Sequence, residues 1–212
     1  MKKYELTTET LQFAGRTLHR IKAVKDFDSI KAGEFGGWIE NEKNLSQDDN
    51  AWIYGDAMVF DNAKILGNAE VYGYAKVYGN AEVYGNAKVY GNAEVYGYAK
   101  VYGNAAIKGD AKVYGNANVS DYAKVYGNAV IKGDAIVHDA VDYIVFKNFW
   151  SSGRYFTWTS SNNKWSVGCF YGTGEELIKK AYADSEKSGR EYERVVRYVE
   201  SILADEKKEK SN

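Results

Sequence analysis

Apolar and polar positions repeat every six residues between Ala51 and Ala140. One unit, Ala81–Asn86, reads Ala-Glu-Val-Tyr-Gly-Asn, so that Ala and Val are two residues apart, as are Glu and Tyr. Because successive side chains of a β-strand point to opposite faces, the Ala and Val positions are predicted to face inward and the Glu and Tyr positions outward. The Gly-Asn pair predicts a corner, since both residues tolerate positive φ. Fifteen uninterrupted units therefore predict a solenoid of short strands and corners.

This repeat resembles that of the hexapeptide-repeat left-handed parallel β-helix, in which three hexapeptides form one triangular coil. The resemblance implies a mainly β protein with about five 18-residue coils. The left-handed sense is taken from that family, because it departs from the usual right-handed crossover. Four segments also resemble the opening segment of β-helix proteins encoded by bacteria and by phages or prophages: Lys31-Ala32-Gly33, Gly36-Gly37-Trp38-Ile39, Asn44-Leu45-Ser46 and Trp52-Ile53-Tyr54-Gly55. Most of those proteins have no assigned function, so the resemblance implies no catalytic residue.

Charge alternates at the outward position before Val, where Lys and Glu follow one another along the chain. In a threefold coil, residue i lies above residue i+18, so this alternation also runs along each face of the solenoid. Glu70 is then expected beside Lys88, and Glu94 between Lys76 and Lys112. Opposite charges on neighbouring strands stabilise their pairing by about 0.2–1 kcal/mol, less where water screens them. The charges therefore predict the register of the coils and do not indicate a binding patch.

The tyrosines of the repeat are expected to stack from coil to coil, which suits aromatic side chains on neighbouring strands. A second interpretation is that one face forms a flat aromatic contact surface, and the two interpretations can hold for different faces. Three further tyrosines replace Asn at corners on three different edges and are candidate partner contacts: Tyr74, Tyr98 and Tyr122.

The segments on either side of the repeat lack its period, and we expect them to cap the two ends of the solenoid. The domains predicted are thus an N-terminal β cap over 1–50, the β-helix over 51–140 and a C-terminal α+β module over 141–212. In the N-terminal cap, alternation predicts a hairpin of strands 4–13 and 17–24.

The C-terminal module is predicted to contain a three-stranded meander, over 143–149, 154–159 and 164–170, and two helices, over about 175–186 and 189–207. Two capping boxes indicate where the helices begin, Thr173 with Glu176 and Ser188 with Glu191. Three apolar residues at the end of the repeat are expected to lie under this module: Val130, Ile136 and Val141.

Composition restricts the partners and the compartment. The 212 residues carry a formal net charge of −1, spread evenly, so nothing indicates binding to nucleic acid or to an anionic membrane. The sequence begins without the apolar run of a signal peptide and has no stretch long enough to span a membrane. Cys169, the only cysteine, cannot form an internal disulfide and is expected to be buried and inert. We therefore expect a soluble protein of the bacterial cytoplasm.

Many hexapeptide-repeat proteins are acyltransferases, and that resemblance implies a histidine base near a loop extruded from the helix. This chain has only His19 and His138, and no loop interrupts its repeat, so His138 is expected to be exposed and without a catalytic role. Two histidines also cannot supply the three-histidine zinc site of the related γ-class carbonic anhydrases. The sequence therefore predicts no catalytic residue, no metal site and no cofactor.

The near-identity of the units is more useful in a binder or spacer than in an enzyme with a fixed site. From the resemblance to phage-encoded proteins, we expect a phage or prophage accessory protein that binds, and inhibits, a host protein such as a defence factor or toxin. The C-terminal module is the first candidate for partner binding or self-association, through Trp150, Tyr155, Trp158, Trp165 and Tyr192. Two alternatives stay open: an acyltransferase-like enzyme, and a structural subunit that assembles into a homo-oligomer.

Overall fold

The structure is a computed structural model that describes residues 2–209. It has two compact units, with the boundary in the chain between Tyr143 and Ile144. The first unit contains both the N-terminal strands and the repeat, which the sequence analysis treated as separate domains. The second unit begins three residues after the expected start of the C-terminal module. No helix in the described part of the chain is long and apolar enough to cross a membrane.

Each hexapeptide contributes one short strand, formed by its outward position and the following Val or Ile. These strands are β4 (Trp52–Ile53), β5 (Met58–Val59), β6 (Lys64–Ile65), β7 (Glu70–Val71), β8 (Lys76–Val77), β9 (Glu82–Val83), β10 (Lys88–Val89), β11 (Glu94–Val95), β12 (Lys100–Val101), β13 (Ala106–Ile107), β14 (Lys112–Val113), β15 (Asn118–Val119), β16 (Lys124–Val125), β17 (Val130–Ile131) and β18 (Ile136–Val137).

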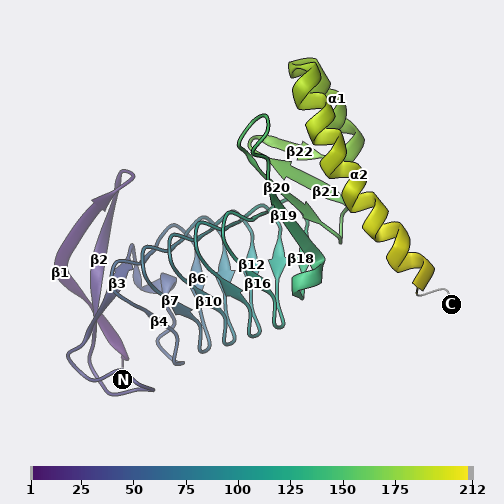
Figure 1. Cartoon of the computed structure of the whole chain (residues 1–212). Helices are drawn as coiled ribbons and strands as arrows, with labels where there is room; N and C mark the ends of the chain where they lie inside the picture. Colours follow the sequence, from purple (N-terminus) through teal and green to yellow (C-terminus); the bar gives the residue numbers. More distant parts are fainter. Residues whose placement is uncertain (1, 210–212) are drawn as a thin grey trace. The chain divides into compact units, whose positions relative to one another are not determined.

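Strands 18 residues apart pair in parallel, so the repeat winds into three sheets (Figure 1). One sheet has the order β16-β13-β10-β7-β4 and the second β18-β15-β12-β9-β6. The third continues from β17-β14-β11-β8-β5 into the N-terminal strands. Lys88 of β10, for example, pairs with Glu70 of β7 on one side and with Ala106 of β13 on the other. The predicted threefold coil is confirmed, and its left-handed sense stays an expectation from the resemblance.

The solenoid core consists of the two inward positions of each unit. Ala87 and Val89 are fully buried, and so are the equivalent residues from Ala51 to Val137. Backbone bonds link one coil to the next, as where the Glu94 N–H donates to the Ala111 carbonyl at 3.0 Å. Because burying one Val stabilises a fold by about 1.5–3 kcal/mol relative to exposure, the stacked Val columns are a major source of stability.

The corners explain why glycine recurs. Gly91 has a φ of +73°, and a Cβ on it would lie 2.9 Å from the Gly109 backbone nitrogen in the next coil. A larger residue would therefore meet both a disfavoured backbone conformation and a rigid neighbour. Asn side chains at the corners also bond from coil to coil. We call one such column the asparagine ladder: Asn50, Asn68, Asn86 and Asn104.

The tyrosine columns stack as expected. Tyr84 and Tyr102 have ring centroids 4.9 Å apart and planes within 2°, and the pairs Tyr72–Tyr90, Tyr78–Tyr96 and Tyr96–Tyr114 are similar. Within these pairs, the stacked ring faces cover one another. The columns therefore present ring edges and hydroxyl groups outward, and not the flat aromatic surface of the second interpretation.

The N-terminal strands extend the third sheet. The expected hairpin is present as β1 (Tyr4–Phe13) and β2 (Arg16–Ala23), and β2 pairs with β3 (Phe35–Ile39). β3 in turn pairs in parallel with β5, and a short 3₁₀ helix, η1 (Glu42–Asn44), follows it. This segment adds an opening turn, so the solenoid has about six turns and not the five expected from the repeat alone.

The C-terminal unit contains four strands and not the expected three. They are β19 (Tyr143–Lys147), preceded by the 3₁₀ helix η2 (Ala140–Asp142), then β20 (Tyr155–Thr159), β21 (Lys164–Val167) and β22 (Phe170–Gly172), in that spatial order. The segment predicted as one strand over 164–170 is divided by a turn at Gly168 and Cys169, where Gly168 has a φ of +57°. Cys169 is therefore exposed, which corrects the expectation of a buried thiol.

Helices α1 (Gly174–Asp184) and α2 (Glu186–Glu209) pack against one face of this sheet. The Thr173–Glu176 capping box at the start of α1 is confirmed. The second predicted box is wrong, because α2 begins three residues earlier than expected. There the Ser185 hydroxyl accepts a hydrogen bond from the Ser188 N–H at 3.1 Å.

Three apolar residues near the end of the repeat, Val130, Ile136 and Val141, belong to the first unit. The expectation that the C-terminal module covers them stays a prediction.

Candidate functional site

A polar cluster lies on the outer surface of the last coils, where other residues replace the outward tyrosine. Ser120 follows β15 and His138 follows β18, so the pairing of these strands places the two residues side by side. Ser120 Oγ lies 2.6 Å from His138 Nδ1, and Asp121 Oδ2 lies 2.8 Å from the same nitrogen. Ser120 is buried, whereas 54% of the His138 side chain is exposed. We call these three residues the His138 cluster.

The backbone holds this cluster in an uncommon local conformation. Asp121 occupies the corner position that glycine fills in most units, with a φ of +55°. Asp tolerates this region better than most residues because its short polar side chain bonds locally. Its Oδ2 accepts a hydrogen bond from Ser120 Oγ at 3.2 Å. After β18, the backbone N–H of His138 donates to Asp142 Oδ2 at 2.7 Å. Neighbouring groups thus hold the Asp121 carboxylate and the backbone of His138.

The contacts at Nδ1 determine what the imidazole can do. A carboxylate can only accept a hydrogen bond, and Ser120 directs its own proton toward Asp121, so both oxygens present lone pairs to Nδ1. This favours the tautomer with the proton on Nδ1 and a lone pair on Nε2. The contacts of the ring with Ser120 and with Asp121 are both made at Nδ1. In a Ser-His-Asp triad the serine bonds Nε2 instead, so His138 cannot activate Ser120 as a nucleophile here.

Ser120 and Asp121 are not neighbours of His138 along the chain, so local sequence patterns do not identify them as its partners. The signal was available in the 18-residue register, which places position 120 beside position 138. Both Ser120 and His138 replace Tyr, and Asp121 replaces Gly, so three departures from the repeat coincide in space.

The three corner tyrosines are exposed but separate. Tyr74, Tyr98 and Tyr122 are each at least 65% exposed. They lie in three different columns of corner residues, since none of them is a multiple of 18 residues from another. They therefore do not form a common patch.

The aromatic candidates of the C-terminal module divide into core and surface. Trp158, Trp165 and Tyr192 are buried between the sheet and the helices, so they are not available to a partner and their role is corrected to packing. Tyr155 is partly buried, with the Lys147 ammonium 5.3 Å from its ring centre. Trp150 is 66% exposed.

Trp150 borders a groove of about 320 Å³ in the same module. Phe146 of β19 and Val195 and Tyr198 of α2 contribute apolar surface to it, and Arg194 lies at its rim. The groove is a candidate contact surface because Trp is enriched at interface hot spots and Trp150 is exposed beside apolar side chains.

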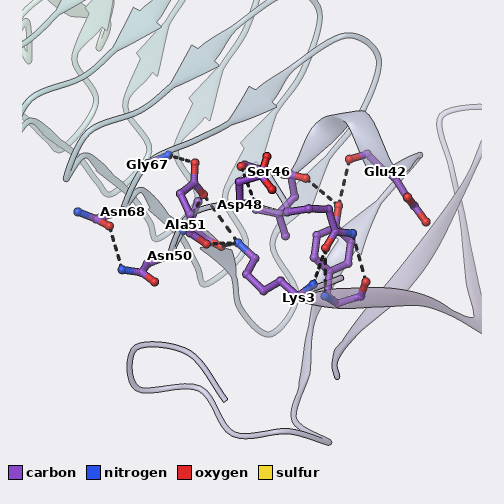
Figure 2. Close-up of polar contacts among 12 residues, drawn as sticks. Lys3, Glu42, Ser46, Asp48, Asn50, Ala51, Gly67 and Asn68 are labelled. Carbon is purple, nitrogen blue, oxygen red and sulfur yellow. Dashed lines mark hydrogen bonds and ion pairs between the residues drawn. The ribbon is translucent and has the colours of Figure 1, made fainter. Parts of the chain in front are cut away.

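A second polar network anchors the start of the chain (Figure 2). Lys3 is buried, and its ammonium donates to the Asp49 carbonyl at 2.7 Å and to the Ala51 carbonyl at 2.8 Å. Burial lowers the pKa of Lys3 to about 8, and the nearby Asp49 carboxylate opposes that shift. The Gln47 side chain accepts hydrogen bonds from the backbone of Lys3 and Tyr4. This network fixes β1 against the first coil.

No group of three or more His, Cys, Asp or Glu in the described residues is arranged to hold a metal ion. Cys169 lies in the exposed turn between β21 and β22 and is the only cysteine of the chain.

Comparison with known proteins relates the repeat to one family. Residues 123–139 match the model of the YdcK β-solenoid repeat. The chain is also 39% identical over 62 residues to a protein of Escherichia coli strain K12 named "Uncharacterized acetyltransferase YdcK". That match covers 26% of this chain and 19% of the relative, so the chain spans only about a fifth of that protein. The phage or prophage origin expected from the sequence stays a prediction. The segment 123–139, which includes His138, is thus similar to a YdcK-type β-solenoid repeat.

Proposed function

We propose that this chain transfers an acyl group from a thioester donor, with His138 as the general base. The observation that carries this proposal is the pair of contacts at Nδ1, from Asp121 and Ser120, which favours a lone pair on Nε2. Such an arrangement suits a base that must accept a proton at one defined atom. From the sequence, no catalytic role is expected for His138. That expectation does not take account of Ser120 and Asp121, which contact the ring in the structure.

In the proposed reaction, Nε2 of His138 takes a proton from an amine or hydroxyl of the acceptor. The acceptor atom attacks the thioester carbonyl carbon, a new C–N or C–O bond forms, and the C–S bond breaks. The thiolate then receives the proton from Nε2. Asp121 would stabilise the imidazolium that exists between the two proton transfers, as a carboxylate beside a histidine base does in other enzymes. Asp121 is thus a positioning residue, and His138 is the catalytic one.

Two further observations support the proposal. The matched repeat segment contains His138, and the relative that this chain partly matches is named an uncharacterized acetyltransferase. Acyl donors fit an imidazole that is half exposed, because both the donor and the acceptor must reach Nε2 from solvent. The uninterrupted repeat offers no extruded loop, so the substrates would bind on the outer surface of the last coils.

The proposal is tested by following thiol release from acetyl-coenzyme A with amine and hydroxyl acceptors. We expect His138→Gln to lower the rate about 100-fold or more, since general bases contribute roughly 10²–10⁴-fold. Asp121→Asn should give a smaller loss and shift the pH dependence of the rate. His19→Gln is the matched control and should leave the rate unchanged. Thiol release that is absent in the wild type, or equal in wild type and His138→Gln, would contradict acyl transfer at this site.

A second candidate function is the binding of a host protein or of another copy of this chain through the C-terminal module. The exposure of Trp150 beside the apolar groove favours it. Trp150→Ala should then abolish retention of a stoichiometric partner, or shift the sedimentation of the chain toward the monomer. Tyr122→Ala, which removes an equally exposed aromatic side chain from a solenoid corner, should change neither. If both variants behave like the wild type, the module does not serve as the contact surface.

A further inference from the structure

A polar groove of about 330 Å³ lies on the first coils of the solenoid. One wall is Asp28, from the loop after β2. The other is the asparagine ladder, which contributes Asn50, Asn68 and Asn86, with Tyr54 and Glu70 beside it. Figure 2 shows Asn50 and Asn68 joined side by side along this edge. This volume falls within the range of roughly 300–1,000 Å³ that is typical of small-molecule pockets.

The ladder leaves hydrogen-bonding capacity on residues that line the groove. Asn68 donates one N–H to Asn86 at 3.0 Å and accepts one bond from Asn50 at 3.3 Å. An Asn amide has two N–H groups and two lone pairs, so the ladder uses one of each. Within the ladder, each inner Asn therefore keeps one N–H and one lone pair for another partner, and this pattern repeats at each coil. A ligand whose groups both donate and accept would satisfy these pairs.

Tyr54 adds an aromatic side chain to the lining of the groove. In the stacked columns, neighbouring rings cover each other's faces. Tyr54 instead lies at 90° to Tyr72, with ring centroids 6.3 Å apart. Its ring faces are therefore not stacked against that neighbour, and one of them can contact the apolar face of a ligand in the groove.

The charges of the groove exclude an anionic ligand. Glu70 pairs with Lys88 at 2.9 Å, so these two charges compensate each other, and Asp28 adds one negative charge. A phosphate or carboxylate would meet repulsion here. The carboxylates of Asp28 and Glu70 are instead strong acceptors for hydroxyl groups, since hydrogen bonds to ionised groups are stronger than those between neutral groups.

We propose that this groove binds a neutral oligosaccharide, which lies along the asparagine ladder. Sugar hydroxyls both donate and accept, so they match the paired amide groups and the carboxylates, while a pyranose ring presents C–H groups to the face of Tyr54. The site is on the first coils, does not involve His138, and stands whether or not the chain transfers acyl groups.

Binding is tested by calorimetric titration of the full chain with three probes: cellohexaose, maltohexaose and chitohexaose. We expect at least one to bind with a Kd of about 1 mM or tighter. Asn68→Ala should weaken that binding at least 10-fold, and Asp28→Asn should weaken it several-fold. Asn80→Ala is the matched control, since it removes one corner-amide bond, to Asn62, on another edge. It should change the Kd less than twofold, and circular dichroism should show that all variants stay folded.

Three outcomes would overturn the proposal. One is the absence of binding by all three oligosaccharides. The second is equal loss of binding in Asn68→Ala and Asn80→Ala, which would place the ligand elsewhere. The third is binding of 1,4-diaminobutane but of no sugar, which would identify the groove as a site for cations. Loss of thiol release in His138→Gln has no bearing on this experiment, so the two proposals fail independently.

Discussion

Lys112 Nζ lies 3.0 Å from Glu94 Oε2, although 18 residues separate the two in the chain. Glu94 also faces Lys76 on its other side, at 3.9 Å. One carboxylate thus lies between two ammonium groups of the neighbouring coils. The alternation of Lys and Glu along the sequence is converted by the threefold winding into alternation between coils.

Reversing the charge of Glu94 should therefore destabilise the solenoid. Glu94→Lys would place three ammonium groups in one column, and we expect a loss of about 1 kcal/mol in the free energy of unfolding at low salt. Urea unfolding at low and at high ionic strength would measure it, and high salt should reduce the difference. Glu94→Gln, which only removes the attraction, should cost less. An effect that does not depend on salt would show that the column does not act through charge.

The corner glycines should differ in what they tolerate. Gly127 has a φ of +65° and nothing within 4 Å of an added Cβ, so Gly127→Ala should cost only the backbone term, about 1–2 kcal/mol. Gly91→Ala meets the Gly109 backbone as well, and we expect a further loss of about 1–3 kcal/mol, as for overpacking. Urea unfolding of both variants would test this. Equal losses would mean that the close approach between coils has no energetic weight.

The buried Lys3 should make stability depend on pH. Its pKa is about 8 in the folded protein, below the ordinary 10.5 of an unfolded chain. Between these values the unfolded chain binds more protons, so the free energy of unfolding should rise with pH, by up to about 3 kcal/mol. Burial raises the pKa of Tyr78 and Tyr143 to about 12, so these groups should lower stability as pH rises above 10. A maximum near pH 10 is expected.

Lys3→Met should remove the rise between pH 8 and 10 in urea unfolding. Lys2→Met, at an exposed neighbouring position, should retain it. If the rise persists in Lys3→Met, another group is responsible.

Gly189 of α2 gives a prediction opposite to helix propensity. Gly to Ala usually stabilises a helix interior by about 1 kcal/mol. Here an added Cβ would lie 2.2 Å from the Tyr182 ring of α1, near the stem of that side chain, so the helices would have to separate. We expect Gly189→Ala to destabilise the C-terminal module, with Ser201→Ala on the exposed face as the neutral control. A raised melting temperature in Gly189→Ala would contradict the observed packing.

The repeat could be derived from sequence because its information is local and redundant. The period of two within each unit identified the buried Ala and Val positions, and the charges identified the 18-residue register. Cys169 was misplaced because Val-Gly-Cys-Phe continues the alternation of a strand, whereas the positive φ of Gly168 ends it there. The sequence predicts Trp158 and Tyr192 as partner contacts, whereas both are buried between the sheet and the helices. Composition does not indicate which face of a sheet the helices cover.

The His138 cluster could not be predicted from local sequence patterns. Its members belong to different coils, so no local pattern joins them, and only the register applied to the departures from the repeat would have found them. The same register places Ser120 next to His138 as surely as it places Glu70 next to Lys88. Irregular positions in a regular solenoid should therefore be compared at multiples of the coil length.

The most direct test of the proposed acyl transfer is the tautomer of the neutral His138 ring. In the His19→Gln variant His138 is the only histidine, so its two ring nitrogens can be assigned by ¹⁵N NMR at a pH where the ring is neutral. The account predicts a proton on Nδ1 and a lone pair on Nε2, with this preference reduced in Asp121→Asn. A ring that carries its proton on Nε2, or that populates both tautomers equally, would contradict it, because the proposed base would then lack its proton-accepting atom.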